Sequence, residues 1–444
     1  MEEEKEKKEE RNEVSALSFQ KKFLFVGDWG MSSDLAWQVR KEGNEVKMYI
    51  GDQGYRDVCD GFVEKVERWQ DHKDWADVIV FEDTGFGNVA DALRKQGKFV
   101  VGGSAYTDKL ESDREFGQAE MKAAGMTVLP HWDFLEFESA INFIKTSPGR
   151  YVFKPSGDVN SDEKDILFIG KEEDGKDIIE VLEHNKKSWS KKIKKFQLQK
   201  FAAGVEIAAG AFFNGTDFIS PVNINFEHKK LFPGDIGPYT GEMGTLMFWA
   251  PENVPIFQLT LAKMKEKLRQ SGYVGYIDIN CVVNGKGIYP LEFTCRFGYP
   301  TISIQMEGVV SSWGEFLHAI AKGEKFDLKI KKGFQLGVVI AVPPFPYEAK
   351  KTFEIYADSS ILFKKPSLEG IHIAEVKLVD GDWHLAGESG YVLVVTGSNS
   401  TVESARKQVY RRIQNIMLQN MFYRTDIGIK WYHESDQLQT WGYI

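Results

Sequence analysis

Residues 272–298 read GYVGYIDINCVVNGKGIYPLEFTCRFG, and this stretch decides the fold. Two apolar-rich runs flank Asn-Gly-Lys-Gly at residues 284–287, a pattern that predicts a β-hairpin. Because side chains alternate along a strand, Glu292 and Thr294 share one face of the second run. Asp278 on the first run joins that face only if the loop holds an odd number of residues, such as three with a glycine-made bulge.

Acids on two paired strands, followed by an arginine, suit phosphate chemistry. Asp278 and Glu292 can hold Mg²⁺ on nucleotide phosphates, and Arg296 can place a cation where negative charge develops. The same segment also fits an ordinary hairpin with one solvent-exposed face. The hairpin alone therefore leaves both interpretations open.

The composition is that of a globular protein. Of the 444 residues, 42% are hydrophobic and 27% are charged, and the length predicts more than one domain. A net charge of −9 argues against general nucleic-acid or membrane-surface binding. The three cysteines lack metal-ligand spacing, and we find neither a signal-peptide core nor an apolar run of membrane-spanning length. We therefore expect a cytoplasmic protein without membrane association.

Hydrophobic periodicity indicates a mixed architecture. From residue 22 to residue 101, short apolar runs alternate with helical segments, which predicts a parallel α/β sheet. From about residue 208 to residue 295 the pattern is mainly antiparallel, and another β-rich unit begins near residue 333. The expected fold class is therefore α/β and α+β.

Three blocks of sequence carry a family resemblance. They are GDIGPYTGEMG at residues 234–244, LEFTCRFGYP at residues 291–300 and FYRTDIG at residues 422–428. They resemble, in the same order, the GDTGPNTGGMG, EFNCRFGDPE and FYRTDIG motifs of the phosphoribosylamine–glycine ligase family, the glycinamide ribonucleotide synthetases of the ATP-grasp superfamily. The similarity extends from about residue 23 to about residue 430, so the chain resembles a divergent member.

The resemblance implies an ATP-grasp fold, in which two α+β subdomains clamp ATP. It also implies an N-terminal parallel α/β (pre-ATP-grasp) domain and a C-terminal β-rich domain. The expected units are a charged and disordered tail at 1–20, the N-terminal substrate domain at 21–125, the small ATP-grasp subdomain at 126–205, the large subdomain with the metal site at 206–330, the C-terminal domain at 331–435 and a tail at 436–444.

The resemblance further implies sites for ATP and for a divalent metal, Mg²⁺ or Mn²⁺. Lys154 corresponds to the phosphate-binding lysine of the family's KADG motif. The metal is expected on Glu292, with Asp278 and Thr294 as secondary ligands. The residues expected to contact ATP are Lys154, Arg114, Gln199, Lys200, Phe201 and Glu206.

Substrate contacts follow from the same resemblance. Asp235 is expected to hold the ammonium of the amino acid, and Arg296 to stabilise the transferring phosphoryl group. Arg424 and Asp426 are expected to hold domains together. The residues expected to contact substrates are Gly27, Gly30, His228, Lys229, Lys230, Gly237, Thr240, Gly241 and Glu242. The two glycines of the first strand-to-helix turn would bind a phosphate through backbone N–H groups, whereas a lone histidine among strands also fits a structural role.

The sequence departs from the family at three places. An acidic stretch at residues 158–165 replaces the family's glycine-rich phosphate loop, and acids beside a triphosphate are unfavourable unless cations offset them. The Arg-Glu-His triplet of the family's first loop is absent from residues 30–37. Glu242 replaces a glycine at the amino-acid site, where its side chain would exclude glycine or bind a different amine.

The activity that the resemblance implies is ATP-dependent carboxylate–amine ligation through an acyl phosphate. Three functions stay open: the parent reaction of purine biosynthesis, which joins glycine to 5-phosphoribosylamine; a repurposed ligase for another amino acid or amine; and a non-catalytic nucleotide-binding paralogue. The expected partners are small-molecule amino-acid and amine substrates, and the expected state is a monomer or homodimer.

Overall fold

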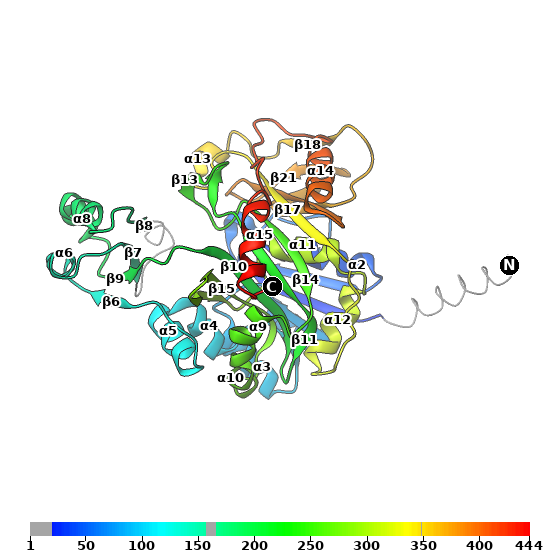
Figure 1. Ribbon diagram of the computed structural model, residues 1–444. Coiled ribbons are helices and arrows are strands. Elements are labelled where there is room, and N and C mark those ends of the chain that lie inside the picture. The colour runs from blue at the N-terminus through cyan, green and yellow to red at the C-terminus, as the bar shows by residue number, and fades with distance from the viewer. Residues whose placement is uncertain (1–19, 157–165, 348) are drawn as a thin grey trace.

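The computed structural model describes residues 20–156, 166–347 and 349–444 (Figure 1). The predicted tail, apart from its last residue, and the acidic stretch at 158–165 lie outside the described residues. Within the described ranges, no helix is both long enough and apolar enough to cross a membrane.

A five-stranded parallel sheet forms the N-terminal region, in the order β3-β2-β1-β4-β5. Its central strands are apolar runs buried on both faces, as parallel sheets covered by helices require. The prediction of a parallel α/β unit is therefore confirmed. The strands are β1 (Lys22–Gly27), β2 (Glu45–Ile50), β3 (Glu64–Lys65), β4 (Val78–Phe81) and β5 (Phe99–Val101), and the helices are α2 (Ser33–Lys41), α3 (Gly87–Lys95), α4 (Ala105–Ser112) and α5 (Arg114–Ala123).

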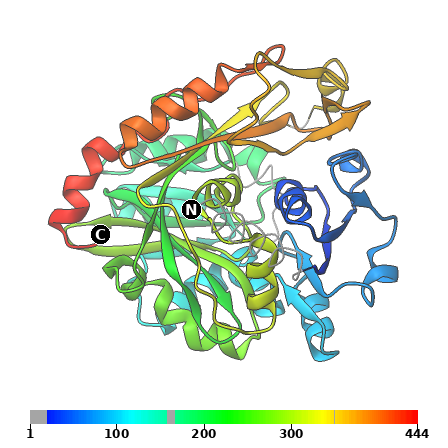
Figure 2. The same cartoon turned by 90° about the vertical axis from the view of Figure 1, so that its right-hand side faces the viewer.

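An eight-stranded sheet forms the centre of the molecule, and every pairing in it is antiparallel. In sheet order its strands are β16 (Gly287–Thr294), β15 (Val274–Asn284), β10 (Val205–Asn214), β11 (Phe218–Glu227), β14 (Gly244–Ala250), β17 (Phe334–Ala341), β22 (Tyr391–Asn399) and β19 (Ile371–Ile373). The sheet runs through the segment 206–330 and continues into the segment 331–435. Figure 2 shows it from the side, with helices α14 (Val402–Ile413) and α15 (Trp431–Thr440) above it.

A small four-stranded sheet stands apart from this centre, on the left in Figure 1. It consists of β6 (His131–Phe134), β9 (Lys195–Lys200), β7 (Tyr151–Ser156) and β8 (Phe168–Ile169), with helices α6 (Phe137–Thr146) and α8 (Lys176–Trp189). Its buried residues form a hydrophobic cluster of their own, which includes Ile144, Phe153 and Phe196. This unit packs its own core beside the large sheet.

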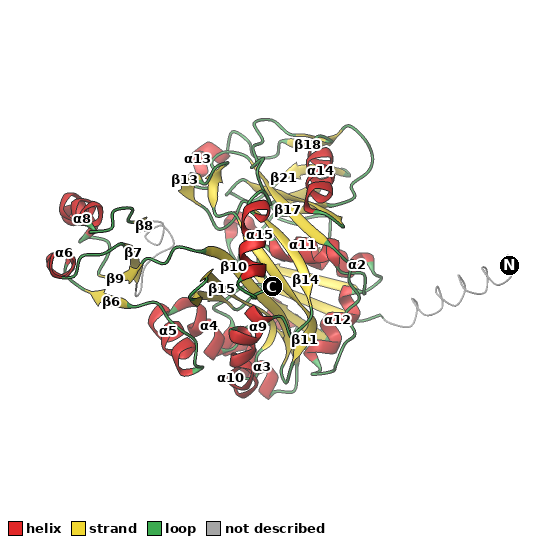
Figure 3. Cartoon of the chain, in the orientation of Figure 1, coloured by secondary structure: helices red, strands yellow, loops and turns green. Residues whose placement is uncertain are grey.

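The remaining elements connect these sheets and are distinguished by type in Figure 3. They are η1 (Gln53–Tyr55), η2 (Trp69–His72), β12 (Lys230–Phe232), β13 (Ile236–Tyr239), α9 (Pro255–Leu259), η3 (Leu261–Met264), α10 (Lys265–Gln270), α11 (Thr301–Gly308), α12 (Trp313–Ala321), α13 (Lys350–Phe353), β18 (Ser360–Phe363), β20 (Val376–Val379), β21 (Asp382–Leu385) and β23 (Ile416–Met417).

The β15–β16 hairpin forms as predicted. Asn284 pairs with Gly287, so the loop holds two residues, and the condition that Asp278 joins the face of Glu292 only with an odd-numbered loop is wrong. Instead, the register shifts within the ladder, because Asn280 pairs with Glu292 and the next residue pairs with Pro290. Leu291 is the extra residue of this β-bulge. The bulge places Asp278 opposite Thr294 on the shared face.

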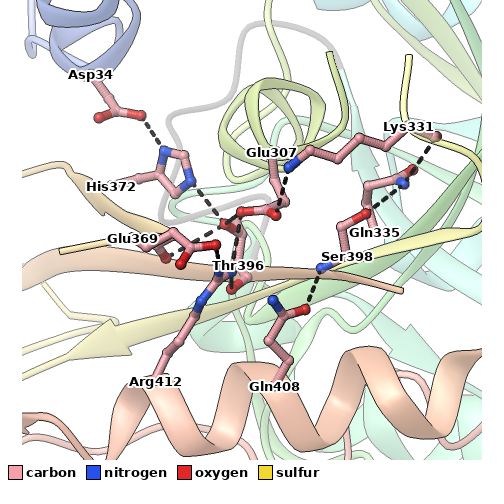
Figure 4. A network of polar contacts seen from close by, with 11 residues as sticks. Asp34, Glu307, Lys331, Gln335, Glu369, His372, Thr396, Ser398, Gln408 and Arg412 are labelled. Atoms are coloured by element: carbon pink, nitrogen blue, oxygen red, sulfur yellow. Dashed lines mark hydrogen bonds and ion pairs between the residues drawn. The ribbon is translucent and has the colours of Figure 1, made fainter. Parts of the chain in front are cut away.

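A polar network joins the N-terminal region to the C-terminal strands (Figure 4). Nδ1 of His372 on β19 lies 2.6 Å from an Asp34 oxygen on α2, and its Nε2 lies 2.8 Å from the Thr396 hydroxyl on β22. That hydroxyl also lies 3.0 Å from Glu307, which accepts a hydrogen bond from Arg412. The Asp–His–Thr order is that of a hydrolytic triad, but Thr396 is fully buried. The network therefore fastens elements together.

Candidate active site

Two adjoining cavities lie between the small sheet and the large sheet. The first has a volume of about 180 Å³ and the second of about 370 Å³, and both are lined by Arg114, Leu291 and Glu292. Every residue expected to contact ATP lines the first cavity: Lys154, Arg114, Gln199, Lys200, Phe201 and Glu206. The structure thus brings together side chains from α5, β7, β9, β10 and β16.

One end of the first cavity suits a purine ring. Leu129, Val152 and Val282 give it apolar walls. The buried Gln199 side chain contributes an amide nitrogen that has no partner among the described residues. Phe201 is held beside it, with the Arg150 guanidinium 3.4 Å from its ring centroid. Apolar walls with an unpaired buried donor are a typical environment for a heteroaromatic ligand.

The other end of the first cavity collects cations. Burial, and then the charge of Arg114, lowers the pKa of Lys154 to about 7. Lys229 extends its ammonium to 3.1 Å from Glu292 and 3.4 Å from Glu227. Burial alone would lower the pKa of Lys229, but these two carboxylates raise it well above its usual value. Phosphate oxygens would complete the coordination of such a cluster.

Glu292 is the carboxylate that the cavities share. Lys229 is the largest influence that holds its pKa down, at about 2, so the carboxylate stays ionised at neutral pH. Asp278 lies opposite Thr294, fully buried, and burial followed by repulsion from Glu227 raises its pKa to about 8. One Asp278 oxygen has no hydrogen-bond partner among the described residues.

This donor set fits a metal that is bound jointly with nucleotide phosphates. Among the described residues, no three His, Cys, Asp or Glu side chains stand close enough to hold a metal by themselves. Mg²⁺ commonly takes only one or two carboxylates and completes its shell with phosphate oxygens and water. Glu292 supplies an ionised carboxylate, with Thr294 beside it on the second cavity.

The sequence reasoning missed Asn280 and Glu227. Asn280 lies directly opposite Glu292, and its side-chain nitrogen lies 3.3 Å from a Glu227 oxygen. The signal for Asn280 was its position two residues after Asp278, which puts both on one face of β15. Glu227 immediately precedes the predicted substrate run, but no pattern in the sequence linked it to Glu292.

Arg296 lines the second cavity and not the first. Its Nε lies 3.4 Å from Asp83 and 3.3 Å from Glu111, and its Nη1 donates to the carbonyl of Phe297. Glu111 in turn accepts from the Cys295 N–H at 2.6 Å. These contacts hold the guanidinium at the cavity wall. Asp83 and Glu111 were not predicted, because they come from the segment after β4 and from α4, far away in sequence.

Asp235 lies elsewhere, on neither cavity. Its backbone has a φ of +56°, and its two oxygens lie 2.9 Å from Arg424 and 2.9 Å from Lys430. Asp426 pairs with the same arginine and accepts from the Gly234 N–H. In this structure Asp235 therefore binds cations of the chain itself, and its role in holding a substrate ammonium stays a prediction. Arg424 and Asp426 join the β12–β13 hairpin to the C-terminal segment.

Some residues of the loop from His228 to Glu242 line the cavities, and others are buried in the protein. Lys229 lines the first cavity, and Gly241 lines the second, where a Cβ would meet open space. Burial lowers the pKa of His228 to about 3, so this fully buried ring is neutral and fits the structural role. Glu242 is buried, and burial followed by Glu227 raises its pKa well above the usual value.

Three residues of this loop make contacts within the loop itself. Lys230 donates to the carbonyl of Gly237 at 3.1 Å and lies over the Tyr239 ring. Thr240 donates to the carbonyl of Lys229 at 2.9 Å. Lys230, Gly237 and Thr240 line neither cavity and instead shape the turn that carries Lys229 and Gly241.

Gly27 and Gly30 form the turn between β1 and α2, but the N–H groups there are already occupied. The carboxylate of Glu82 accepts from the N–H groups of Trp29, Gly30 and Ser32 at 2.9–3.1 Å. A Cβ on Gly27 would lie 1.8 Å from a Glu82 oxygen, so glycine is required there. The prediction that these groups bind a substrate phosphate therefore disagrees with the structure, where a protein carboxylate takes that place.

Comparisons with known proteins agree with this geometry. The ATP-grasp (A) domain of phosphoribosylglycinamide synthetase matches residues 112–302, and the C domain of the same enzyme matches residues 335–430. A phosphoribosylamine–glycine ligase of Listeria monocytogenes is 25% identical over 77% of this chain and 81% of its own length. One from Streptococcus pneumoniae is 24% identical over 92% of this chain and 99% of its own length.

Solved structures show the same fold. Phosphoribosylamine–glycine ligase of Thermotoga maritima superposes with a TM-score of 0.66 at 23% identity, covering 92% of this chain and 100% of that one. Biotin carboxylase of Campylobacter jejuni, in complex with an ATP analogue, gives a TM-score of 0.62 at 12% identity, covering 95% and 96%. With two domain matches that together span well over half of its length, the chain belongs to the phosphoribosylglycinamide synthetase family and has the ATP-grasp fold.

Proposed function

We propose that this chain is an ATP-dependent carboxylate–amine ligase that works through an acyl phosphate. The observation that carries the proposal is the joined pair of cavities. One combines apolar walls with Lys154, Arg114 and Lys229, and the other holds Arg296, with the ionised Glu292 between them. Family membership and the activity of the named relatives support the same reaction class.

The reaction follows from this layout. Lys154 and Arg114 hold the phosphates of ATP, while Glu292, helped by Thr294, would hold Mg²⁺ or Mn²⁺ between them. The metal supplies charge neutralisation on the transferring phosphoryl group. An oxygen of the substrate carboxylate attacks the γ-phosphorus, the bond to the β-phosphate oxygen breaks, and ADP leaves. Arg296 stabilises the negative charge that forms at the acyl phosphate.

The second step makes the amide bond. The amine nitrogen attacks the acyl carbon, inorganic phosphate leaves, and the nitrogen loses a proton to water or phosphate. The site contributes mainly by holding the two reactants at attack distance, because a bound pair reacts far faster than free molecules. Small-molecule substrates, ATP use and three free, buried cysteines also support a cytoplasmic location. The net charge of −9 supports the absence of general nucleic-acid binding.

Two substrate pairs are compatible with this chemistry. The relatives are named for joining glycine to phosphoribosylamine, and the retained Gly241 and Lys229 support that pair. A different amino acid or amine is the second candidate, and the buried Glu242 favours it. Retention of Glu292, Arg296 and Lys154 at the cavities argues against a non-catalytic paralogue.

The experiment is ADP release from ATP and Mg²⁺ by the Glu292→Ala variant, measured with a panel of amino acids and amines. We expect at least a 100-fold loss of turnover in a variant that still folds, since an electrostatic contact to the transferring group is removed. Glu403→Gln, at an exposed glutamate of α14 that pairs with Lys407, is the matched control and should behave as wild type. Full turnover of Glu292→Ala would overturn the proposal.

A further inference from the structure

The strand that carries Lys154 also carries a serine that lines the second cavity. Ser156 is the last residue of β7, lies two residues after Lys154 and is only 5% exposed. It shares the second cavity with Arg114, Glu292 and Arg296, whereas Lys154 lines the first cavity. One strand therefore presents an ammonium group to the first cavity and a hydroxyl group to the second.

Pairing with β9 fixes the face of the small sheet on which these two side chains lie. Lys154 is directly opposite Gln197, and Ser156 is directly opposite Lys195. Residues directly opposite each other in an antiparallel pair have their side chains on the same face of the sheet. Because side chains alternate along a strand, all four side chains belong to one face.

This face of the small sheet contacts helix α5, which borders both cavities. The side-chain amides of Gln197 and Gln118 are buried and donate to each other at 3.0 and 3.1 Å. Lys195 pairs with Glu115 in the first turn of the same helix. These contacts hold β7 in a fixed place relative to Arg114, which begins α5. The wall of the second cavity is therefore formed by the fold itself.

The hydroxyl of Ser156 has no hydrogen-bond partner among the residues that the structure describes. A buried hydroxyl without a partner costs free energy, which an acceptor on a ligand would recover. The KADG motif that contains the lysine matched by Lys154 has an acid at the position of Ser156. The carboxylate that would repel an anion at this position is thus replaced by a group that can donate to one.

The charges that line the second cavity indicate that the acceptor belongs to an anion. Arg114 and Arg296 both line it. Its two carboxylates already contact cations of the chain, because Glu111 lies 3.3 Å from Arg296 and Glu292 lies 3.1 Å from Lys229. A hydroxyl that donates to an anionic oxygen forms a shorter and stronger hydrogen bond than one between neutral groups.

The arrangement of the two cavities identifies this anion. The apolar walls that suit a purine belong to the first cavity, and Arg114 and Glu292 line both cavities. A nucleotide with its base in the first cavity therefore extends its phosphate chain towards the second. Two residues of a strand span about 7 Å. At that spacing Lys154 and Ser156 contact different phosphates of the same nucleotide.

We infer that the hydroxyl of Ser156 donates a hydrogen bond to the γ-phosphate of ATP in the second cavity and thereby orients the phosphoryl group that is transferred. Ser156 then distinguishes a nucleoside triphosphate from a diphosphate. The inference rests on the ATP binding that the proposed function requires, and it holds for any amino acid and amine that the enzyme joins.

The first test compares a triphosphate with a diphosphate. The β,γ-imido analogue of ATP and ADP are each titrated with Mg²⁺ into the wild-type protein and into Ser156→Ala by calorimetry, without other substrates. We expect Ser156→Ala to bind the analogue about tenfold more weakly than wild type and to bind ADP as wild type does, because one hydrogen bond to a charged group is lost.

The outcomes of this titration separate the inference from the proposed function. An equal loss of affinity for both nucleotides, or no loss for either, would overturn the inference and leave the ligase function standing. A wild-type protein that binds neither nucleotide would overturn both.

The stability of the nucleotide-free protein separates a ligand contact from a structural role. Ser156→Ala removes a buried hydroxyl without a described partner, so its melting temperature should equal or exceed that of wild type. The rise in melting temperature caused by the analogue should be smaller in the variant. A nucleotide-free variant that melts several degrees below wild type would show that the hydroxyl stabilises the fold, and would overturn the inference.

Two further variants serve as rescue and control. Ser156→Thr keeps a hydroxyl at the same position and should keep most of the preference for the analogue over ADP. Ser188→Ala, at an exposed serine of α8 whose hydroxyl donates to the carbonyl of Asn185 at 3.0 Å, should match wild type for both nucleotides. A folded Ser156→Thr that behaves as Ser156→Ala would overturn the role of the hydroxyl.

Turnover tests whether the hydroxyl instead contacts the carboxylate substrate. Hydroxamate formation from amino acids, ATP, Mg²⁺ and hydroxylamine is measured for wild type and Ser156→Ala. We expect kcat/KM for ATP to fall about tenfold in the variant, with the KM for the amino acid unchanged. A raised KM for the amino acid with unchanged constants for ATP would overturn the inference. Absence of hydroxamate from the wild-type protein would overturn the ligase function, and the nucleotide titrations would still decide the role of Ser156.

Discussion

Lys154 shows how a single residue can link nucleotide binding to pH. It lies at the cavity wall on β7, where burial and the neighbouring Arg114 lower its pKa to about 7. In the free enzyme above pH 7 it is therefore largely neutral. Phosphates of a bound nucleotide favour the charged form, so binding above pH 7 must be accompanied by uptake of a proton.

This linkage predicts a specific pH profile for ATP binding. The dissociation constant for ATP should be constant below pH 7 and should rise by up to about tenfold per pH unit above it. Lys154→Arg, which stays charged throughout, should flatten the profile. Calorimetry in buffers of different ionisation enthalpy measures the proton uptake directly. A wild-type profile that is flat from pH 6 to pH 9 would contradict the assignment of Lys154.

Arg424 is the residue whose surroundings could not be foreseen from sequence spacing. It has no exposed surface and pairs with Asp235 and Asp426, which are separated from each other by most of the C-terminal half. The family resemblance pointed to Arg424 as a domain contact but assigned Asp235 to a substrate. A motif identifies a residue, whereas only the fold shows which other charges reach it.

Removing the Arg424 charge should destabilise the protein strongly. Arg424→Met removes the hydrogen bonds of a buried guanidinium to Asp235 and Asp426, and a hydrogen bond to a charged group contributes about 1.5–3 kcal/mol. Urea denaturation measures the change. The matched control is Arg406→Met. Within the described residues this half-buried arginine donates its hydrogen bonds to backbone carbonyls, so its replacement should cost much less. Equal losses in the two variants would show that Arg424 acts through packing alone.

The β15–β16 hairpin illustrates what strand patterns predict and what they miss. Alternating apolar residues around Asn-Gly-Lys-Gly predicted both strands, and the turn chemistry predicted their connection. The bulge at Leu291 was invisible, because an extra residue in one strand leaves the composition and the overall alternation nearly unchanged. Its consequence is large, since it decides whether Asp278 and Glu292 face the same side.

Deletion of Leu291 tests the function of the bulge. Without Leu291 the β15–β16 ladder would be regular, and one part of β16 would have to change faces. Either Pro290 and the residues before it would turn to the opposite face, or Glu292 and Thr294 would turn away from the cavity. We expect the variant to lose ATP-dependent turnover and to lower the melting temperature by several degrees. Leu291→Ala keeps the residue count while it shortens the same side chain, so it is the control and should lose much less turnover than the deletion. Activity of the deletion variant comparable to Leu291→Ala would contradict this account of the site.

At the scale of the whole molecule, two hydrophobic cores meet at the site. The small sheet carries its own cluster, while the parallel sheet and the large sheet share another that extends across the segments 21–125, 206–330 and 331–435. The domain limits proposed from the sequence come from the family resemblance. They could not come from hydrophobic periodicity, because periodicity does not show which strands join into one sheet. Helix α15 is an example, because its polar sequence gives little sign that Leu438 is buried.

Because the two cores are separate, we expect the small sheet and the large sheet to differ in local stability. Ile144→Ala in α6 removes a fully buried side chain from the small core and should cost about 2–5 kcal/mol there. Hydrogen exchange should then accelerate for amides of β7 and β9 but not for those of β10 and β11. Ile144→Val, which costs about 0.5–1.5 kcal/mol, is the control. Equal acceleration in both sheets would show that the two cores unfold as one.

The measurement that tests the central claim most directly is hydroxamate formation from a panel of amino acids with ATP, Mg²⁺ and hydroxylamine. Hydroxylamine replaces the amine substrate, so the acyl phosphate is detected without knowledge of the natural acceptor. We predict that at least one amino acid gives hydroxamate and ADP in equal amounts, and that Glu292→Ala abolishes both. Release of ADP without hydroxamate, or binding of ATP without either product across the panel, would contradict the assignment of this chain as a carboxylate–amine ligase.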